Sequence, residues 1–175
     1  MIGTLALAAP AGADTRAENA THTFEDPSGD CYARSIPAKR SGSAGRTLVY
    51  RIADGRDELL HTFRWYSHRI DIDCDAVGPE GRRGIALVRH GDWPRGREAK
   101  RKDLALAFYF DGETLAEHST LALAGYPRNV STVSHYRVIE STRLDRATGL
   151  FHVLTVDGRE LTFDIGTGQL EAPPT

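Results

Sequence analysis

The chain has 175 residues, 40% of them hydrophobic, and a formal net charge of −2. This length supports one domain with a substantial core and is short for two. The slightly acidic balance disfavours a uniformly basic nucleic-acid binder.

The first thirteen residues are small and apolar. They end in Ala11-Gly12-Ala13, which fits the small-residue rule for signal-peptide cleavage and makes Asp14 the first mature residue. No Lys or Arg precedes this apolar run, so either the natural start lies upstream of Met1 or the segment is a flexible apolar tail. We expect a signal peptide over residues 1–13 and export to the periplasm or the exterior. No other stretch approaches the ~20 apolar residues that span a bilayer, so no transmembrane segment is expected.

Polar, unpatterned residues over 14–23 and a Pro-rich end over 171–175 predict two flexible segments around a single folded domain at 24–170. Within that domain, short runs of β-branched, aromatic and aliphatic residues alternate with turn residues. This pattern is typical of strands.

The chain contains two cysteines, Cys31 and Cys74. In an exported protein this composition predicts one disulfide, and the alternative is two buried reduced thiols. A thioredoxin-like redox site needs cysteines at close spacing, which these two do not have.

Three Asp-Gly pairs lie between strand-like runs, at Asp54-Gly55, Asp111-Gly112 and Asp157-Gly158. These residues tolerate the positive φ of tight hairpin turns, so three hairpins are expected.

Further strands are expected at 32–36, 69–74, 84–90 and 130–141. The total is about nine or ten strands, an all-β fold of antiparallel hairpins in a sandwich or barrel. The run 115–123 is the one helix candidate, and the Asp-Gly turn before it favours a strand. Long loops are expected at 37–46 and 92–103.

Phe24, Asp26-Pro27-Ser28-Gly29 and Tyr32-Ala33, followed by Leu48-Val49-Tyr50, Asp54-Gly55 and Leu59-Leu60, form a recurring strand and turn pattern. The pattern resembles one blade of a β-propeller of the WD40 or TolB-like kind, and the later two Asp-Gly segments are similar to its second half. The resemblance covers about three blade-like units, fewer than closed propellers use. It implies a small or incomplete propeller-like meander as the alternative fold, and a binding scaffold without assigned functional residues.

Three aspartates alternate along one expected strand, at positions 71, 73 and 75. A calcium loop needs Gly at its sixth position and Glu at its twelfth, where this chain has Ala76 and Arg82. The alternation instead predicts a strand that turns Ile70, Ile72 and Cys74 inward and the three aspartates toward water.

None of the seven histidines, at positions 22, 61, 68, 90, 118, 135 and 152, has the spacing of a zinc site, and no cofactor motif is present. Ser131, Ser134 and His135 resemble a nucleophile near a base, but the adjacent Ser134 and His135 point to opposite faces of a strand. We therefore expect no metal and no cofactor, and a non-catalytic protein rather than an enzyme. The alternative is a metal-binding protein or a hydrolase whose site is assembled from distant residues.

Positive charge is concentrated in residues 82–102, where eight Lys or Arg stand against Asp92 and Glu98. That segment carries +6, so the remainder carries −8. We predict a partner-binding set made of one aromatic and five cationic residues: Trp93, Arg95, Arg97, Lys100, Arg101 and Lys102. The alternative is a solvated loop with a buried Trp93. The expected function is an exported binding or inhibitor-like module whose partner is an acidic protein or an anionic envelope component, not a nucleic acid.

Overall fold

The computed structural model describes residues 20–38, 44–132 and 135–171 of the chain. These residues form an all-β protein with thirteen strands in four antiparallel sheets, and within them no sheet closes into a barrel. The all-β, antiparallel prediction is confirmed. The expected signal peptide at 1–13 lies outside the described residues, and no helix within them is long and apolar enough to cross a bilayer.

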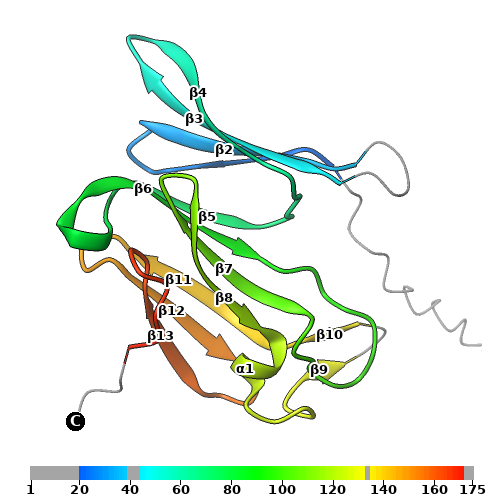
Figure 1. The fold of residues 1–175 in the computed structure, drawn as a ribbon. Coiled ribbons are helices and arrows are strands. Elements are labelled where there is room, and N and C mark those ends of the chain that lie inside the picture. Colours follow the sequence, from blue (N-terminus) through cyan, green and yellow to red (C-terminus); the bar gives the residue numbers. More distant parts are fainter. Residues whose placement is uncertain (1–19, 39–43, 133–134, 172–175) are drawn as a thin grey trace, which may run out of the picture.

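The first sheet contains four strands in chain order: β1 (His22–Glu25), β2 (Cys31–Ile36), β3 (Arg46–Ala53) and β4 (Arg56–Phe63). It lies at the top of the molecule in Figure 1. The segment 14–23 was predicted to be flexible, and β1 begins at its end, where His22 and Thr23 pair with Ser35 and Arg34.

The central sheet also contains four strands in chain order: β5 (Ile70–Val77), β6 (Arg83–His90), β7 (Leu104–Phe110) and β8 (Glu113–Ser119). A short 3-10 turn (Pro79–Gly81) joins β5 to β6. Both faces of β6 and β7 are covered, which explains their continuous apolar sequences. Leu87 and Tyr109 pack toward the first sheet, whereas Val88 and Phe108 belong to the other core cluster.

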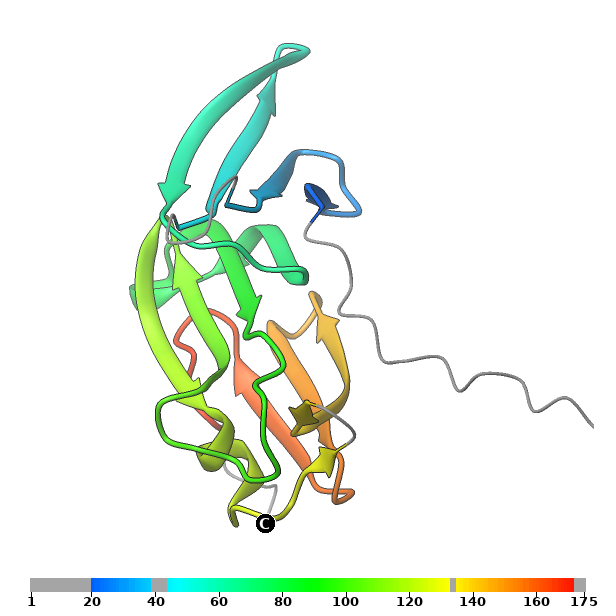
Figure 2. The same ribbon diagram turned by 90° about the vertical axis from the view of Figure 1, so that its right-hand side faces the viewer.

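The last sheet contains β11 (Ile139–Asp145), β12 (Leu150–Thr155) and β13 (Glu160–Asp164). It packs Phe151, Val153 and Phe163 into the core beneath the central sheet. Figures 1 and 2 show these two sheets facing each other, with the first sheet above them. A small ribbon of β9 (Ser131–Thr132) and β10 (Tyr136–Arg137) lies at the end of this sandwich.

The predicted strand over 130–141 is thus divided among β9, β10 and β11. This division and the extra strand β1 account for a total above the expected nine or ten.

All three predicted hairpins are present. Asp54 and Gly55 have φ of 52° and 70°, and Asp111 and Gly112 have φ of 45° and 84°. These pairs make two-residue turns with positive φ at both positions, as the primed turns require. The third connection, residues 156–159, is longer, and there only Gly158 has positive φ, at 84°.

The run 115–123 does not stay extended. It forms the end of β8 and then a short helix, α1 (Thr120–Ala124), so the prediction of a strand through residue 123 was wrong. The Ser119 side chain accepts a hydrogen bond from the Ala122 amide at 3.1 Å, and Gly125 ends the helix with φ of 69°. A Ser at the N-terminal cap and a Gly after the last turn are recognisable helix signals. The prediction gave more weight to the Asp-Gly turn before this run, which favours a strand.

The predicted disulfide is confirmed. Cys31 on β2 and Cys74 on β5 are bonded, with Cα atoms 5.8 Å apart. Because these strands belong to different sheets, the bond fixes the first sheet to the central one. Cys31 is 1% exposed and belongs to the core cluster between the two sheets.

The prediction that β5 turns all three aspartates toward water was wrong. Asp73 is 6% exposed, and Asp71 bonds His90. A bulge between Asp73 and Ala76 disrupts the simple alternation, and the Asp73 carboxylate accepts a hydrogen bond from the Asp75 amide at 3.0 Å. Burial raises the pKa of Asp73.

Candidate functional site

Residues 91–103, here called the basic loop, join β6 to β7 at the end of the sandwich that also carries α1 and β9 (Figure 1). The loop leaves β6 through Gly91, whose amide donates to the Ala105 carbonyl at 2.9 Å. A Cβ at position 91 would lie 1.9 Å from the Leu104 carbonyl oxygen. The close approach of these two backbone segments therefore requires glycine.

Backbone hydrogen bonds hold the basic loop against the neighbouring elements. The Tyr136 amide on β10 donates to the Pro94 carbonyl at 2.9 Å, and the Ala99 amide donates to the Pro127 carbonyl at 2.7 Å. The Ala99 side chain is 4% exposed and packs in the core. The loop is thus anchored near its start and its middle.

A buried cluster of hydroxyl groups anchors the far end of the basic loop. The Tyr136 hydroxyl donates to Asp103 Oδ2 at 2.6 Å and lies 2.9 Å from Thr120 Oγ1. Thr120 in turn accepts from the Lys100 amide at 3.0 Å. Burial, followed by the hydrogen bond to Asp103, raises the pKa of Tyr136 to about 12, so the hydroxyl stays protonated at neutral pH.

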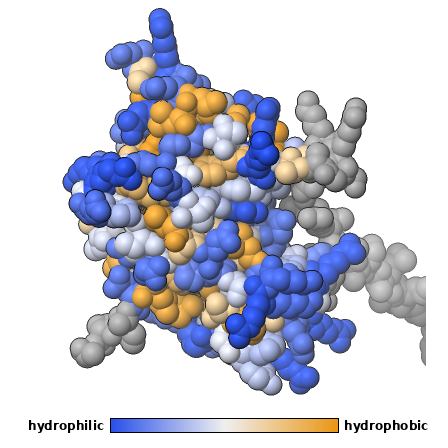
Figure 3. Space-filling view, viewed as in Figure 1, coloured by the Kyte–Doolittle hydropathy of each residue, from blue (hydrophilic) through white to orange (hydrophobic). Residues whose placement is uncertain are grey.

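The predicted binding residues all lie on the outside of this anchored loop. Trp93 is 57% exposed, so the alternative of a buried Trp93 is excluded. The five cationic side chains are also exposed: Arg95, Arg97, Lys100, Arg101 and Lys102. Figure 3 shows a hydrophilic surface where the β6–β7 connection runs in Figure 1.

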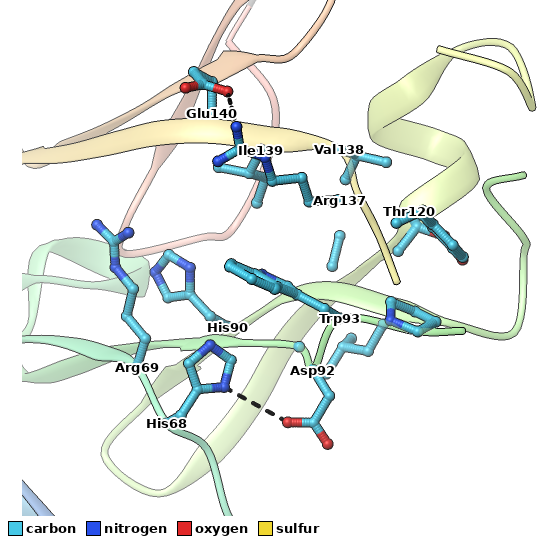
Figure 4. A pocket seen from close by; sticks show the side chains of 15 residues that line it. His68, Arg69, His90, Asp92, Trp93, Thr120, Arg137, Val138, Ile139 and Glu140 are labelled. Atoms are coloured by element: carbon cyan, nitrogen blue, oxygen red, sulfur yellow. Dashed lines mark hydrogen bonds and ion pairs between the residues drawn. The ribbon is translucent and has the colours of Figure 1, made fainter. Parts of the chain in front are cut away.

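Trp93 borders a hollow of about 300 Å³, called here the Trp93 hollow. Its polar walls come from the segment before β5, the end of β6 and the strands β10 and β11: His68, Arg69, His90, Arg137 and Glu140. Figure 4 shows the Trp93 ring extending into this space, with Arg137 and His68 on opposite sides of it in that view. The rings of His68 and Trp93 meet edge to face with centroids 6.3 Å apart.

Two histidine–aspartate pairs lie at the Trp93 hollow. His90 Nε2 lies 2.7 Å from Asp71 Oδ2, and His68 Nδ1 lies 3.6 Å from Asp92 Oδ1. Burial lowers the pKa of His90 even though the Asp71 carboxylate acts in the opposite direction. His90 is therefore neutral near pH 7, with its Nε2 committed to Asp71.

Two of the other histidines make local contacts. His118 Nε2 lies 2.8 Å from the Gly168 carbonyl, and His152 Nδ1 lies 3.3 Å from the Thr162 hydroxyl. Among residues 20–38, 44–132 and 135–171, no group of three or more His, Cys, Asp or Glu is arranged to hold a metal ion. Ser134 lies outside the described residues.

A larger hollow of about 700 Å³ lies beside β5 and the β11–β12 turn. Both arginines that line it are paired with aspartates: Arg146 bonds Asp26 at 3.0 Å, and Arg83 bonds Asp75. Because Arg146 also bonds the Ile72 carbonyl at 2.8 Å, this region joins three parts of the fold. It has a structural role, and the Trp93 hollow is the better candidate site.

The sequence indicated Trp93 and the basic loop but missed His68, Arg69 and Arg137. These residues come from distant positions, and only the packing of the sheets brings them to the hollow. No local motif marks them.

Comparisons of the chain with protein-family models, curated proteins and solved structures found no match. The resemblance to propeller blades therefore stays a prediction.

Proposed function

We propose that the chain is a non-catalytic, exported binding module that recognises an anionic partner through Trp93 and the basic loop. The observation that supports this most directly is the combination of an anchored backbone with exposed side chains. Hydrogen bonds from Ala99 and Tyr136 hold the loop, while Trp93 and five cations point outward. A pre-ordered loop loses less conformational entropy on binding than a mobile one.

Charge distribution supports the same proposal. Residues 82–102 carry +6 in a chain with a net charge of −2. Such a dipolar arrangement orients an approaching anion and raises its association rate at low salt. The effect weakens with ionic strength because the Debye length falls to about 8 Å at physiological salt.

The test is to measure binding to four polyanions at low and near-physiological salt: poly-L-glutamate, polyphosphate, a carboxylated polysaccharide and anionic lipid vesicles. The loop variant replaces its five cations with Gln: Arg95, Arg97, Lys100, Arg101 and Lys102. The matched control replaces five exposed arginines of the first sheet and the segment after it: Arg34, Arg46, Arg51, Arg56 and Arg64. Both variants lose the same formal charge.

We expect the wild type to bind at least one of these polyanions. The loop variant should bind it about ten-fold or more weakly, a loss of about 1.4 kcal/mol, with a smaller salt dependence. The control should retain most of the affinity. Failure to bind any of the four at low salt would refute the proposal, and so would equal losses in the two variants.

A second candidate function is hydrolysis, favoured by the two histidine–aspartate pairs at one hollow. A histidine oriented by a carboxylate can act as a general base. The test is turnover of activated ester and phosphodiester substrates by the wild type and by His90→Gln and His68→Gln. Turnover abolished by either substitution would support a hydrolase, whereas no turnover above the buffer rate would reject it for these substrates.

A further inference from the structure

We propose that the Trp93 hollow binds one sugar ring of an anionic polysaccharide, with the ring stacked on Trp93 and the basic loop contacting the acidic groups of the polymer. This inference rests on the proposed function and specifies the partner's chemical class.

The surroundings of Trp93 favour a ligand that is polar at its edges and apolar on one face. The described residues include six exposed large hydrophobic side chains. Of these six, Trp93 belongs to the basic loop and Tyr126 lies next to it. The other four lie on the first sheet, at the end of β5 and near the C-terminal end: Ile52, Leu59, Val77 and Leu170. A protein partner would normally require a broad patch with an apolar centre, roughly 800 Å² on each side.

The walls of the Trp93 hollow supply hydrogen-bond donors and acceptors in neighbouring pairs. Arg137 Nη2 lies 2.8 Å from Glu140 Oε2, and His68 lies 3.6 Å from Asp92. Sugar hydroxyls donate and accept at once, so they can insert into such pairs without leaving a charge unpaired. The C–H face of a pyranose ring carries partial positive charge, which suits the negative face of an indole.

The volume of about 300 Å³ lies at the small end of ligand sites and accommodates one ring rather than a folded surface. The five cations that follow Trp93, from Arg95 to Lys102, are exposed and do not line the hollow themselves. A polymer with one ring in the hollow presents further acidic groups to them.

Tyr126 provides a second exposed aromatic ring on this side of the molecule. It is 59% exposed and directly precedes Pro127, whose carbonyl accepts the Ala99 amide at 2.7 Å. Arg128 lies 3.5 Å from Glu98 of the same loop. Aromatic and cationic groups thus occur together along the basic loop, as contact with a chain of charged rings requires.

The test compares two polymers with matched numbers of carboxylates: oligogalacturonate, in which every ring carries a carboxylate, and poly-L-glutamate, which has no rings. Neutral dextran controls for rings without charge. Affinities are measured by calorimetry for the wild type, Trp93→Ala, Tyr126→Ala and the five-cation loop variant. A single-stranded oligonucleotide of similar charge serves as a competitor.

We expect oligogalacturonate to bind about ten-fold more tightly than poly-L-glutamate, and Trp93→Ala to remove that preference, because aromatic anchors carry much of the energy of such contacts. The tryptophan fluorescence of the wild type should change with oligogalacturonate and not with poly-L-glutamate, and that of Trp93→Ala, which keeps Trp65, should change with neither. The exposed position of Trp93 makes loss of folding unexpected, and circular dichroism checks it.

Equal affinities for the two polymers, with no effect of Trp93→Ala, would overturn the sugar proposal while leaving the proposed anion-binding function intact. Preferential binding of the oligonucleotide would also overturn it. If neither polymer bound and the loop variant behaved as the wild type, the proposed function would fail as well.

Discussion

His90 Nε2 lies 2.7 Å from Asp71 Oδ2, so a nearly buried histidine at the end of β6 is bonded to the edge strand β5. The His90 side chain is 8% exposed, against 24% for Asp71. The rings of His90 and Phe151 make a T-shaped contact with centroids 6.0 Å apart, and Arg69 and His68 add unfavourable positive charge nearby. Burial and these two positive groups therefore favour a neutral imidazole beside the Trp93 hollow, against the opposite effect of the Asp71 carboxylate.

This arrangement predicts that stability falls on mild acidification. The pKa of His90 is lowered from 6.5, so the unfolded state binds a proton before the folded state does. By linkage, the free energy of unfolding is highest above pH 6.5 and decreases as the pH falls toward the folded pKa. Urea denaturation at a series of pH values measures this slope.

The variant His90→Gln should flatten the slope in that window. Other groups, including Asp73 with its raised pKa, are present in both proteins and cancel in the difference. Identical pH dependence in the wild type and the variant would show that His90 does not titrate as described.

The disulfide predicts a large stability loss when both cysteines are replaced by Ser. Cys31 and Cys74 are 43 residues apart, and cross-linking a loop of that length contributes roughly 4 kcal/mol in the chain-entropy model. That is a large share of the about 5–15 kcal/mol typical of a domain. Urea unfolding of the double variant measures the loss. A change in the free energy of unfolding below about 1 kcal/mol would contradict this prediction.

Arg146 should matter more to stability than its exposed position indicates. Burial raises the pKa of Asp26, but hydrogen bonds from Ser28 and Arg146 outweigh this and hold it below its usual value. Replacing Arg146 by Ala removes the partner of this buried carboxylate and one bond to the Ile72 carbonyl. We expect a loss of about 2 kcal/mol, less than for a fully buried pair because Arg146 is partly exposed.

Arg143→Ala is the matched control for this substitution. Arg143 belongs to the neighbouring strand and pairs with Asp145 at 3.7 Å, but its side chain is 66% exposed. Its removal should change the free energy of unfolding by less than about 0.5 kcal/mol. Equal losses at the two positions, measured by urea denaturation, would argue against a specific role for Arg146.

The elements that the sequence predicted well are those determined by local interactions. Asp54-Gly55 and Asp111-Gly112 form tight turns in which both residues have positive φ. Asp and Gly tolerate that backbone conformation, so each turn could be predicted from the pair and the strand-like residues beside it. The exposure of the basic loop follows from its charge. Its anchors were not predictable, because Tyr136 and Thr120 reach it only after β8, α1 and β10 have packed together.

The orientation of β5 could not be predicted for a related reason. The aspartates at 71, 73 and 75 alternate as on a strand with one solvated face, yet the first sheet covers one side of β5 and Arg146 approaches its backbone. Burial of Asp73 depends on a bulge that no residue type in the segment specifies. The site residues His68, Arg69 and Arg137 were missed because their proximity depends on this tertiary packing.

The hydrogen bonds of the buried Tyr136 hydroxyl predict that its removal weakens the attachment of the basic loop. In Tyr136→Phe, Asp103 loses a hydrogen bond of 2.6 Å and Thr120 one of 2.9 Å. We expect a loss of about 1–3 kcal/mol and faster hydrogen exchange at the Lys100 amide, which depends on Thr120.

Tyr32→Phe is the matched control, because the Tyr32 hydroxyl donates to Asp57 at 2.8 Å on an exposed surface. That substitution should cost less than about 1 kcal/mol and leave exchange in the basic loop unchanged. The pKa of Tyr136 is raised from 10.0 to about 12, so the folded state keeps a proton that the unfolded state loses. The contribution of this hydroxyl is therefore complete below pH 10 and lost as the pH rises toward about 12, where the wild type and Tyr136→Phe should converge in stability. A constant difference between the two proteins across that range, measured by urea denaturation, would show that the Tyr136–Asp103 bond does not control the titration.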